Sequence, residues 1–518
     1  MSRTRLPWLA LVVALNFLGL AEQAEAANHY VRPAGATYGT GSGNDWQNAC
    51  TDFTGSCAVG SLVRGDTYYI AGSSGGGNGT YAGRNFNRAT NGSLVITIKK
   101  ATVADHGGNE TGWSNAFGTS QAVFATGIEF GTSFWVFDGV TGGGPGTPGS
   151  PQWTIGHGIK IDVSSIGNCS GGIDIQDPFT DIAIRHVEIH GHGPDGSQLC
   201  TQDGLNVGSD FTTGVSVGPA TTNLIFSHLW VHDIGRVPFF LRAHGVLIEY
   251  SRFGKFESCN NGTSSGFACP APGQHAELMS VWRCATAACP PGATLVQNLT
   301  FRYNFVTDGG TPDSTGGIIC SCTGLRVYGN IWAGRDGGTF SGVTNGLIGT
   351  WSNDSLQNAE VYNNTFIGTN ADSGRVFGLF DLPNFNDTLT IRNNLFYQAK
   401  VGNDSGGYTA CCANITRTHN YYISLVDGPI GSEVTQQTGS SNPFQGFSSE
   451  DYRLVTNSTA GFDTGAGPLV AGVQHTFNVD MYGNPRTTWT RGAIEFAAAG
   501  PPTPALPFRG GTRRPWRR

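Results

Sequence analysis

Apolar and polar side chains alternate in a six-residue motif that recurs along this chain. The motif reads LTFRYN at 299–304, and later copies reach the same final residue at Asn330, Asn364, Asn394 and Asn420, after intervals of 26, 34, 30 and 26 residues. In almost every copy the residues three and five positions before the end are apolar. Alternation with a period of two is typical of a β-strand with one buried face. Recurrence at this spacing predicts a solenoid of stacked coils.

Earlier copies of the motif keep its rhythm without the final Asn, and they end at Gly139, Val187, Leu229 and Ser251. Two residues after the end of the later copies stands an apolar, largely aromatic column: Val306, Trp332, Phe366, Phe396 and Tyr422. We expect this column to stack inside the next face of the coil. The Asn residues are expected at the bends, where Asn tolerates left-handed backbone angles, with their amides hydrogen-bonded from coil to coil.

This strand–Asn–aromatic pattern, over 130–425, resembles the right-handed parallel β-helix proteins of the pectin lyase-like superfamily. The segments YVRP at 30–33 and GDTYYI at 65–70 are similar to the first turns of secreted bacterial members, and 480–496 is similar to their closing strand. The resemblance implies an all-β fold, a right-handed parallel β-helix with long side loops. It also implies polysaccharide lyase or glycoside hydrolase activity, but it indicates no specific member.

The chain divides into five segments. Arg3, Arg5, the apolar run 8–20 and the small residues at 24–26 predict a bacterial-type signal peptide at 1–26, and hence a secreted or periplasmic protein. We expect an N-terminal cap and first coils at 27–129 and a β-helix core at 130–425 that carries a Cys-rich insertion at 252–298. C-terminal coils and a cap should follow at 426–497, and a disordered tail rich in Pro and Arg at 498–518.

The composition limits the classes of partner that this chain is expected to bind. The chain has 77 Gly and only 13% charged residues, which suits a protein that turns often. Its net charge of −7 gives no indication of nucleic-acid binding, so we expect no nucleic-acid partner. No stretch after the signal peptide is long and apolar enough for membrane insertion. We expect a monomer that binds a polysaccharide, and any site for a polyanion must be basic locally.

Twelve cysteines in an exported chain predict disulfides. Their spacing favours the pairs 50–57, 259–269, 284–289 and 169–200. Cys320 and Cys322 could pair with Cys411 and Cys412, but spacing does not fix that connectivity. A zinc site at Cys284 and Cys289 is the alternative interpretation of that pair.

One outward column could bind a polymer. Two residues before the motif's end it reads Arg185, Ser227, Glu249, Arg302, Tyr328, Tyr362 and Arg392. Tyr rings stack on sugar faces and Arg binds uronate carboxylates, so we expect Tyr328, Tyr362, Arg392 and Arg185 to contact substrate. The alternative is that Tyr and Arg merely cover an exposed sheet.

A second group could supply catalysis. His275 and Glu277 share one face of an expected strand, and Arg242 and Arg302 are expected on neighbouring coils. A lyase needs a base for the proton alpha to the uronate carboxylate, here His275, and a cation, Arg or Ca²⁺, for the charge that develops. Glu277 with another acid would instead suit a hydrolase. A structural ion pair is the third interpretation.

Arg236 and Arg242 belong to a segment that resembles the Arg-x-Pro-x-x-Arg motif of pectate lyases, with one residue too many before the second Arg. Arg236 is therefore a further substrate-binding candidate. His190 and His232 occupy equivalent positions three residues after the motif's end, and Asp233 follows His232. These three residues could bind a metal or move protons, or they could cap backbone groups in a turn.

The sequence therefore favours an exported carbohydrate-active protein, with β-elimination on a uronate polysaccharide as the first hypothesis. A non-catalytic, adhesin-like or matrix protein that uses the helix as a binding rod is the leading alternative. Glycoside hydrolysis is the second alternative.

Overall fold

The computed structural model describes residues 26–75, 77–108, 110–165, 171–191, 203–207, 221–256, 263–264, 267–268, 277–281, 295–307, 316–333, 347–350, 356–368, 380–381, 388–399, 401, 414–425, 433, 435–461, 469–470, 473–474 and 477–496. The expected signal peptide up to Glu25 and the expected tail lie outside these residues. No helix among them is long and apolar enough to cross a membrane.

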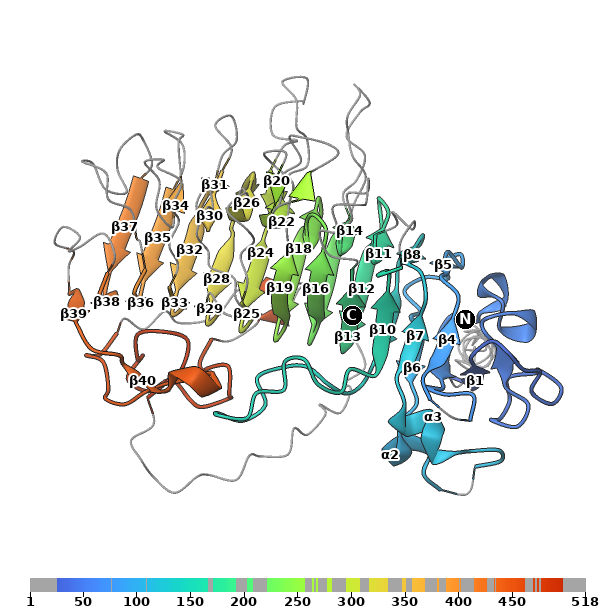
Figure 1. The fold of residues 1–518 in the computed structure, drawn as a ribbon. Helices are drawn as coiled ribbons and strands as arrows, with labels where there is room; N and C mark the ends of the chain where they lie inside the picture. The colour runs from blue at the N-terminus through green and yellow to red at the C-terminus, as the bar shows by residue number, and fades with distance from the viewer. Residues whose placement is uncertain are drawn as a thin grey trace, which may run out of the picture.

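Three long sheets, in which every strand pair is parallel, form the body of the molecule (Figure 1). Sheet A has the strand order β2 (Cys50–Thr51), β1 (Asn28–Arg32), β3 (Thr67–Ile70), β6 (Ile96–Lys100), β9 (Trp135–Asp138), β12 (Thr180–Arg185), β15 (Thr222–Ser227), β18 (His244–Glu249), β24 (Leu299–Arg302), β28 (Arg326–Tyr328), β32 (Ala359–Tyr362), β35 (Thr388–Arg392) and β37 (Asn414–Thr418). Sheet B has the order β39 (Gln437–Gly439), β38 (Tyr421–Ile423), β36 (Leu395–Tyr397), β33 (Thr365–Ile367), β29 (Ile331–Ala333), β25 (Phe305–Val306), β19 (Arg252–Phe256), β16 (Trp230–Ile234), β13 (Val187–His190), β10 (Ile159–Asp162), β7 (Ala122–Phe124) and β4 (Gly79–Tyr81). Sheet C has the order β34 (Phe380–Asp381), β30 (Ile348–Gly349), β26 (Gly316–Cys320), β22 (Glu277–Val281), β17 (Phe239–Leu241), β14 (Leu205–Val207), β11 (Ile173–Ile175), β8 (Ile128–Phe130) and β5 (Asn85–Phe86).

Each coil of the core visits sheets A, B and C in turn, as β12, β13 and β14 do before the chain returns to sheet A at β15. Successive coils stack in chain order, so the predicted all-β solenoid is confirmed as a right-handed parallel β-helix. Smaller elements flank it: β23 (Val296–Gln297), β27 (Cys322–Thr323), β31 (Leu356–Gln357), the antiparallel pairs β20 (Thr263–Ser264) with β21 (Phe267–Ala268), β40 (Phe444–Gly446) with β41 (Asp451–Leu454) and β42 (Leu469–Val470) with β43 (Val473–Gln474), the helices α2 (Val103–His106) and α3 (Asn115–Thr119), and the 3-10 turns η1 (Gly55–Cys57), η2 (Val59–Ser61) and η4 (Phe447–Ser449).

The interior of the coils is filled by the predicted apolar columns, with one register error. Ile182 and Ile184 of β12 pair with Trp135 and Phe137 of β9 and share the core with them. The motif copy placed at 139 therefore aligns one residue later than the sequence suggested. That copy lacks the Asn that marks the bend, so alternation alone had to fix its register.

The Asn residues form the expected ladder. Asn304, Asn330, Asn364, Asn394 and Asn420 are fully buried. The backbone N–H of Asn364 donates to Oδ1 of Asn394 over 2.9 Å, and its Nδ2 donates to the same oxygen over 3.0 Å. Equivalent bonds join the other members, and Glu433 ends the row by accepting from Asn420 over 2.7 Å. The buried amides thus satisfy one another from coil to coil.

The left-handed residue at this bend is not the ladder Asn but the residue before it. The φ angles of Tyr303, Asn363, Asn393 and His419 are 54°, 51°, 55° and 57°. The prediction that the ladder Asn itself adopts this conformation was therefore wrong. The aromatic column two positions later is confirmed. The rings of Phe366 and Phe396, on adjacent strands of sheet B, stack in the core of the coil with centroids 5.1 Å apart.

The C-terminal segment 477–496 is not a closing strand. Instead it crosses the outside of the corner between sheets A and B: the N–H of Gly492 donates to the carbonyl of Asn393 over 2.7 Å, and the hydroxyl of Tyr303 donates to the carbonyl of Val479 over 2.9 Å. Its Phe477 belongs to a second apolar cluster, outside the coils, with Tyr328 and Tyr362. Among the described strands the helix ends at β39.

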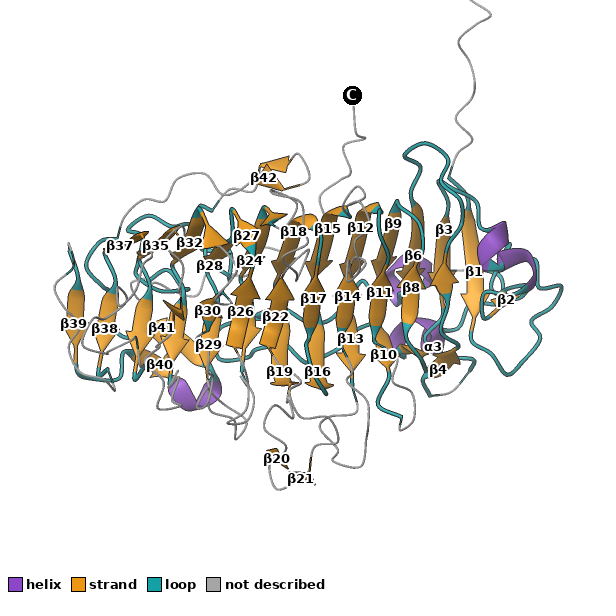
Figure 2. Cartoon of the chain, turned by 90° about the horizontal axis from the view of Figure 1, so that it is seen from above, coloured by secondary structure: helices purple, strands orange, loops and turns teal. Residues whose placement is uncertain are grey.

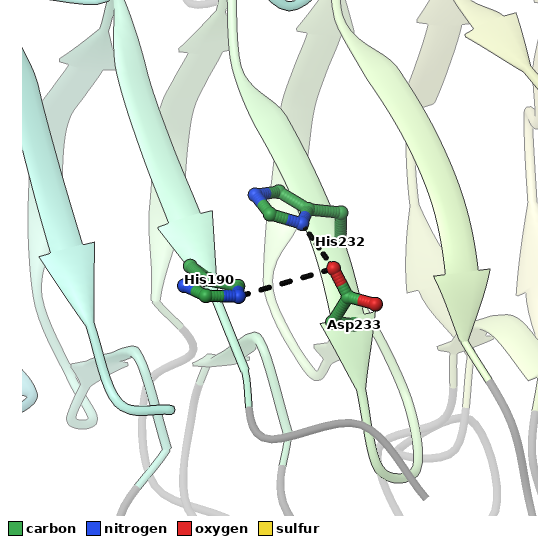
Figure 3. A group of neighbouring side chains, drawn as sticks. All are labelled: His190, His232 and Asp233. Atoms are coloured by element: carbon green, nitrogen blue, oxygen red, sulfur yellow. Dashed lines mark hydrogen bonds and ion pairs between the residues drawn. The ribbon is translucent and has the colours of Figure 1, made fainter. Parts of the chain in front are cut away.

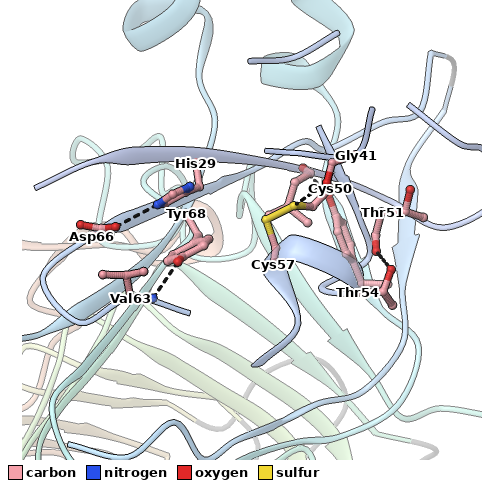
Figure 4. The surroundings of a disulfide bond; sticks show 11 residues. His29, Gly41, Cys50, Thr51, Thr54, Cys57, Val63, Asp66 and Tyr68 are labelled. Atoms are coloured by element: carbon pink, nitrogen blue, oxygen red, sulfur yellow. Dashed lines mark hydrogen bonds and ion pairs between the residues drawn. A yellow bond between two sulfur atoms is a disulfide. The ribbon is translucent and has the colours of Figure 1, made fainter. Parts of the chain in front are cut away.

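Disulfides brace the described coils at two places. Cys50 and Cys57 are bonded in the N-terminal cap, as spacing predicted (Figure 4). Cys320 and Cys322 are bonded to each other, which corrects the expectation that they meet the vicinal pair at 411–412. The other predicted pairs, and the zinc alternative, involve residues outside the described ranges. The expected insertion 252–298 is also not all loop, because β19 and β22 are regular coil strands within it.

Candidate functional site

The predicted outward column on sheet A exists as a register row. Arg302 pairs with Tyr328, Tyr328 with Tyr362, and Tyr362 with Arg392. However, Tyr328 is 0% and Tyr362 3% exposed, because the ring of Phe477 packs edge-on against both, 4.5 Å and 5.2 Å away. The two rings stack on each other and are shielded from solvent, so a sugar ring cannot stack on them.

The arginines of this row have structural partners. Arg302 donates to Oε2 of Glu249 from Nε over 2.8 Å and to the hydroxyl of Tyr328 over 3.2 Å. Burial by itself lowers the pKa of Arg302, but the charge of Glu249 together with the neighbouring Tyr328 and Tyr303 raises it overall. Arg392 pairs with Glu360 over 2.8 Å. Arg185, on β12, is half-buried and lies between Asp138 and Ser227 in the row.

The predicted catalytic group does not converge within the described residues. Arg302 lies on sheet A, whereas Glu277 belongs to sheet C and Arg242 lies directly beyond a strand of that sheet. Glu277 begins β22, and Arg242 follows the end of the neighbouring parallel strand β17, so the two lie at opposite ends of adjacent strands. Glu277 is 1% exposed. His275 lies outside the described residues.

A different row, on sheet C, gathers polar side chains that the sequence did not single out. Glu129, Asp174 and Asn206 are register partners on β8, β11 and β14, which lie side by side in Figure 2. Each points away from the coil, because its apolar neighbours on both sides are buried in the core. The row therefore presents two carboxylates and an amide, one per coil, on a half-buried surface.

Two arginines border this row on its next coil, around the ring of Phe240. Arg242 donates from Nη1 to Oδ1 of Asn206 over 3.2 Å, and its guanidinium carbon lies 4.1 Å from the Phe240 centroid. Arg236 lies 5.3 Å from the same centroid and pairs with Asp203 over 3.3 Å. Phe240 itself pairs with Asn206 in the register. The two arginines of the imperfect pectate lyase-like motif thus meet beside the acidic row.

The electrostatics of this row are unusual for carboxylates. Burial raises the pKa of Asp174 to about 6, the negative charge of Glu129 adds to the effect, and Arg242 opposes it. Burial also raises the pKa of Asp203, although the positive charge of Arg236 partly opposes this rise. A carboxylate with a raised pKa beside a cation in a half-buried row is a candidate acid–base group.

The sequence contains a weak signal for this row. The segments IEF at 128–130, IDI at 173–175 and LNV at 205–207 each place one polar residue between two apolar ones. Their separations of 45 and 32 residues differ, and no ladder Asn marks them. The sequence therefore contains no marker residue and no regular spacing from which the register of these three short strands could be predicted.

The predicted His–Asp group lies on sheet B (Figure 3). His190 and His232 are register partners, as expected, and their rings stack with centroids 4.6 Å apart. Burial by itself raises the pKa of the neighbouring Glu188, but the close imidazole of His232, a hydrogen bond from Gln121 and the charge of Lys160 lower it to about 2. Burial lowers the pKa of His232, but its hydrogen bond to Asp233 and the nearby carboxylate of Glu188 overcome this and raise it.

No family model and no curated protein matches this chain. Solved structures with a similar fold include the pectate lyase Pel9A, at 13% identity over 92% of this chain and 97% of that chain, with a TM-score of 0.39. A GH136 lacto-N-biosidase from Eubacterium ramulus is 11% identical over 80% of this chain and 68% of that chain, with a TM-score of 0.37. A PL6-family polysaccharide lyase from Pseudopedobacter saltans is 11% identical over 77% of this chain and 94% of that chain, with a TM-score of 0.28. These similarities concern the fold and carry no argument about activity.

Proposed function

We propose that this protein is an exported enzyme that cleaves a uronate-containing polysaccharide by β-elimination on the outer face of sheet C. The observation that carries the proposal is the juxtaposition of Asp174, with its pKa raised to about 6, and Arg242, which reaches the same row. A rigid sheet presents one side chain per coil at about 4.8 Å intervals, which suits an extended polymer.

In this mechanism Asp174 is the base. It removes the proton alpha to the uronate carboxylate, the electron pair forms a carbon–carbon double bond, and the glycosidic oxygen leaves from the beta carbon and takes up a proton. Arg242, which already donates to Asn206, binds the carboxylate and stabilises the enolate-like charge. A pKa of about 6 makes Asp174 a stronger base than an ordinary Asp while it remains largely ionised at neutral pH.

A specific observation also favours a second reaction, glycoside hydrolysis. Glu129 and Asp174 are register partners on adjacent parallel strands. Adjacent strands lie about 4.8 Å apart, close to the ~5 Å separation of the two carboxyl groups in retaining glycosidases. In that case Glu129 and Asp174 would serve as nucleophile and acid–base pair. The glutamate that the sequence suggested for this role, Glu277, is buried away from the row.

Ca²⁺ stays a candidate cofactor of the lyase reaction. Carboxylate oxygens such as those of Glu129 and Asp174 are the ligands that Ca²⁺ prefers. Within the described ranges, however, the three potential ligands that lie close enough to hold one ion are His190, His232 and Asp233, on sheet B. Glu129 and Asp174 do not belong to that group. The need for Ca²⁺ is therefore a variable of the assay and not a premise of the mechanism.

The test is incubation of the mature protein with polymers of galacturonate, of mannuronate and guluronate, and of glucuronate, and with a neutral glucan, each with and without Ca²⁺. Ultraviolet absorbance of unsaturated uronate and the number of new reducing ends are followed together. We expect both to rise with one acidic polymer. Asp174→Asn should reduce turnover at least 1,000-fold, roughly the upper range for loss of a catalytic base, whereas the matched Asp105→Asn should not.

The two readouts separate the hypotheses. New reducing ends without absorbance would establish hydrolysis, and Glu129→Gln should then abolish it as completely as Asp174→Asn. Polymer binding with neither product would favour the adhesin-like binding role. Binding and turnover that persist in Arg242→Ala, with Arg326→Ala as the control on sheet A, would remove sheet C from the mechanism.

A further inference from the structure

Three side chains from two neighbouring coils converge on sheet B. His190 ends β13, and His232 and Asp233 belong to β16, the next strand (Figure 3). Nε2 of His190 lies 3.9 Å and Nδ1 of His232 lies 2.5 Å from the same oxygen, Oδ2 of Asp233. One potential ligand atom from each of the three residues falls within 4.8 Å of the others. Two imidazole nitrogens thus share one carboxylate oxygen.

The backbone is specially shaped to achieve this. Successive residues of a strand face opposite sides, so Asp233 should point into the core if His232 points out. Asp233 instead adopts a left-handed φ of 54°, and the strand then continues with Ile234 in the core. A left-handed non-Gly residue within a strand costs free energy and needs a compensating interaction. Here it places His232 and Asp233 on the same outer face.

Each imidazole also has a carboxylate at its other nitrogen. Oδ1 of Asp162 lies 3.4 Å from Nδ1 of His190, and Oε1 of Glu188 lies 3.5 Å from Nε2 of His232. Metal-bound histidines commonly have this arrangement, in which an outer carboxylate orients the ring and fixes the tautomer that leaves the inner nitrogen free to ligate. Two histidines and two separate outer carboxylates place the groups of this pattern twice around one centre, although neither outer contact has the geometry of a hydrogen bond in this structure.

The charge of the group is also unbalanced in the direction that favours a cation. Three carboxylates, those of Asp162, Glu188 and Asp233, stand beside one ammonium, Lys160, which lies 3.0 Å from Asp162 and 3.3 Å from Glu188. With both imidazoles neutral, the difference is two negative charges. His232 is 7% exposed and the ring of Trp230 stacks on it at 3.8 Å, so water screens the cluster poorly on that side.

We propose that His190, His232 and Asp233 bind one divalent transition-metal ion of the Zn²⁺ class. The ligand atoms would be Nε2 of His190, Nδ1 of His232 and an oxygen of Asp233, with water or a polymer hydroxyl completing the coordination. Imidazole nitrogens favour Zn²⁺, Co²⁺ or Ni²⁺ over Ca²⁺ and Mg²⁺, which prefer oxygen ligands. The site lies on sheet B and the proposed catalytic row on sheet C, so each proposal can fail without the other.

The test is titration of metal-stripped, full-length mature protein with Co²⁺ and Zn²⁺, followed by calorimetry and by the visible absorption of bound Co²⁺. We expect one equivalent to bind with micromolar or tighter affinity, unaffected by excess Ca²⁺ or Mg²⁺, and to raise the melting temperature. His190→Gln and Asp233→Asn should each weaken binding at least 100-fold. Asp162→Asn, an outer-shell change, should weaken it about 10- to 100-fold.

His29→Gln is the matched control, because His29 is a half-buried histidine that pairs with one carboxylate, Asp66, over 2.9 Å but has no second imidazole in that pair (Figure 4). It should bind the metal as the wild type does. Circular dichroism establishes that each variant is folded. If a ligand variant does not fold, Asp162→Asn still tests the site, because it changes an outer carboxylate and leaves all three ligands in place. Wild-type binding weaker than millimolar, or binding that survives in both His190→Gln and Asp233→Asn, would overturn the site.

Discussion

Asp174 and Glu129 show at the scale of single residues how a chemically useful group can destabilise the fold that holds it. Both carboxylates stand on adjacent strands of a half-buried row, and burial together with their mutual repulsion raises the pKa of Asp174 to about 6. Its ordinary value is 3.8. The folded protein therefore holds this proton more tightly than the unfolded chain does, and stability falls as pH rises through the interval between the two values.

Asp174→Asn should consequently stabilise the protein while it abolishes turnover. Well below pH 3.8 the carboxyl is protonated in both folded and unfolded states, so the stability difference between the variant and the wild type should vanish as the pH is lowered toward about 3. Above pH 6 the variant should be more stable, by up to about 3 kcal/mol for a shift of ~2 pKa units. Urea unfolding at pH 4, 5, 6 and 7 measures this. A stability difference that does not change with pH would contradict the raised pKa.

Two arginines show that the type of a residue does not by itself decide its role. Arg302 and Arg242 are both outward arginines of the coils, yet Arg302 is held by Glu249 and Tyr328, whereas Arg242 reaches Asn206 beside a carboxylate of raised pKa. Only the partners, and not the sequence motif, separate a structural arginine from a candidate for catalysis.

At the scale of elements, the Asn ladder links the later coils to one another at the bend between sheets A and B. The amide of Asn364 accepts from Asn330 and donates to Asn394 and to the carbonyl of Val327, all within the core. A strand of three or four residues makes few ladder bonds of its own, so these side-chain bonds fix where each coil turns. A buried polar group that loses its partner costs about 1–3 kcal/mol.

Asn364→Ala should therefore lower the free energy of unfolding by about 3–5 kcal/mol, because it leaves groups of Asn330, Asn394 and Val327 without partners at once. The matched control is Asn414→Ala, at an exposed position on β37, which should change stability by less than about 0.5 kcal/mol. Denaturant unfolding of both variants gives the comparison. Equal, small effects would mean that water replaces the lost amide inside the corner.

The whole molecule is a one-dimensional stack, so stability can differ along its length. The coils around β13 and β16 are bordered by buried histidines. Burial lowers the pKa of His157 to about 4 and that of His228 to about 3, and the ring of His228 stacks between His186 and Tyr250. The later coils carry the Asn ladder, which does not titrate. Acid should therefore act unevenly along the helix.

A buried neutral histidine contributes stability that is complete above its ordinary pKa of about 6.5 and is lost as pH falls toward the lowered value. Between pH 6.5 and 4 we expect β13 and β16 to lose amide protection before β33 and β36 do. Hydrogen exchange, corrected for the intrinsic effect of pH, measures this. His228→Phe, which keeps the ring stack, should delay the loss in β13 and β16. Uniform loss of protection in all coils would show one cooperative unit.

The structure of the coil can be predicted from the sequence alone. Alternation placed the apolar columns, and the recurring Asn and aromatic residues fixed the ladder and the stack inside sheet B, because these features depend on neighbours that recur at equivalent positions of every coil. Where the marker was absent the register slipped, as it did at β9, paired through Trp135 and Phe137 with β12. The resemblance to parallel β-helix proteins depended on the same markers, so it predicted the fold and not the site.

Which face of the coil is open depends on contacts between distant parts of the folded chain. Phe477 covers Tyr328 and Tyr362, some 115 to 149 residues earlier in the chain, and no period in the sequence connects them. Glu129, Asp174 and Asn206 come together through strands of only three residues at unequal spacing. Backbone alternation is local and can be read along the chain. Which distant segment buries a face is decided by the free energy of removing aromatic surface from water once the whole chain has folded.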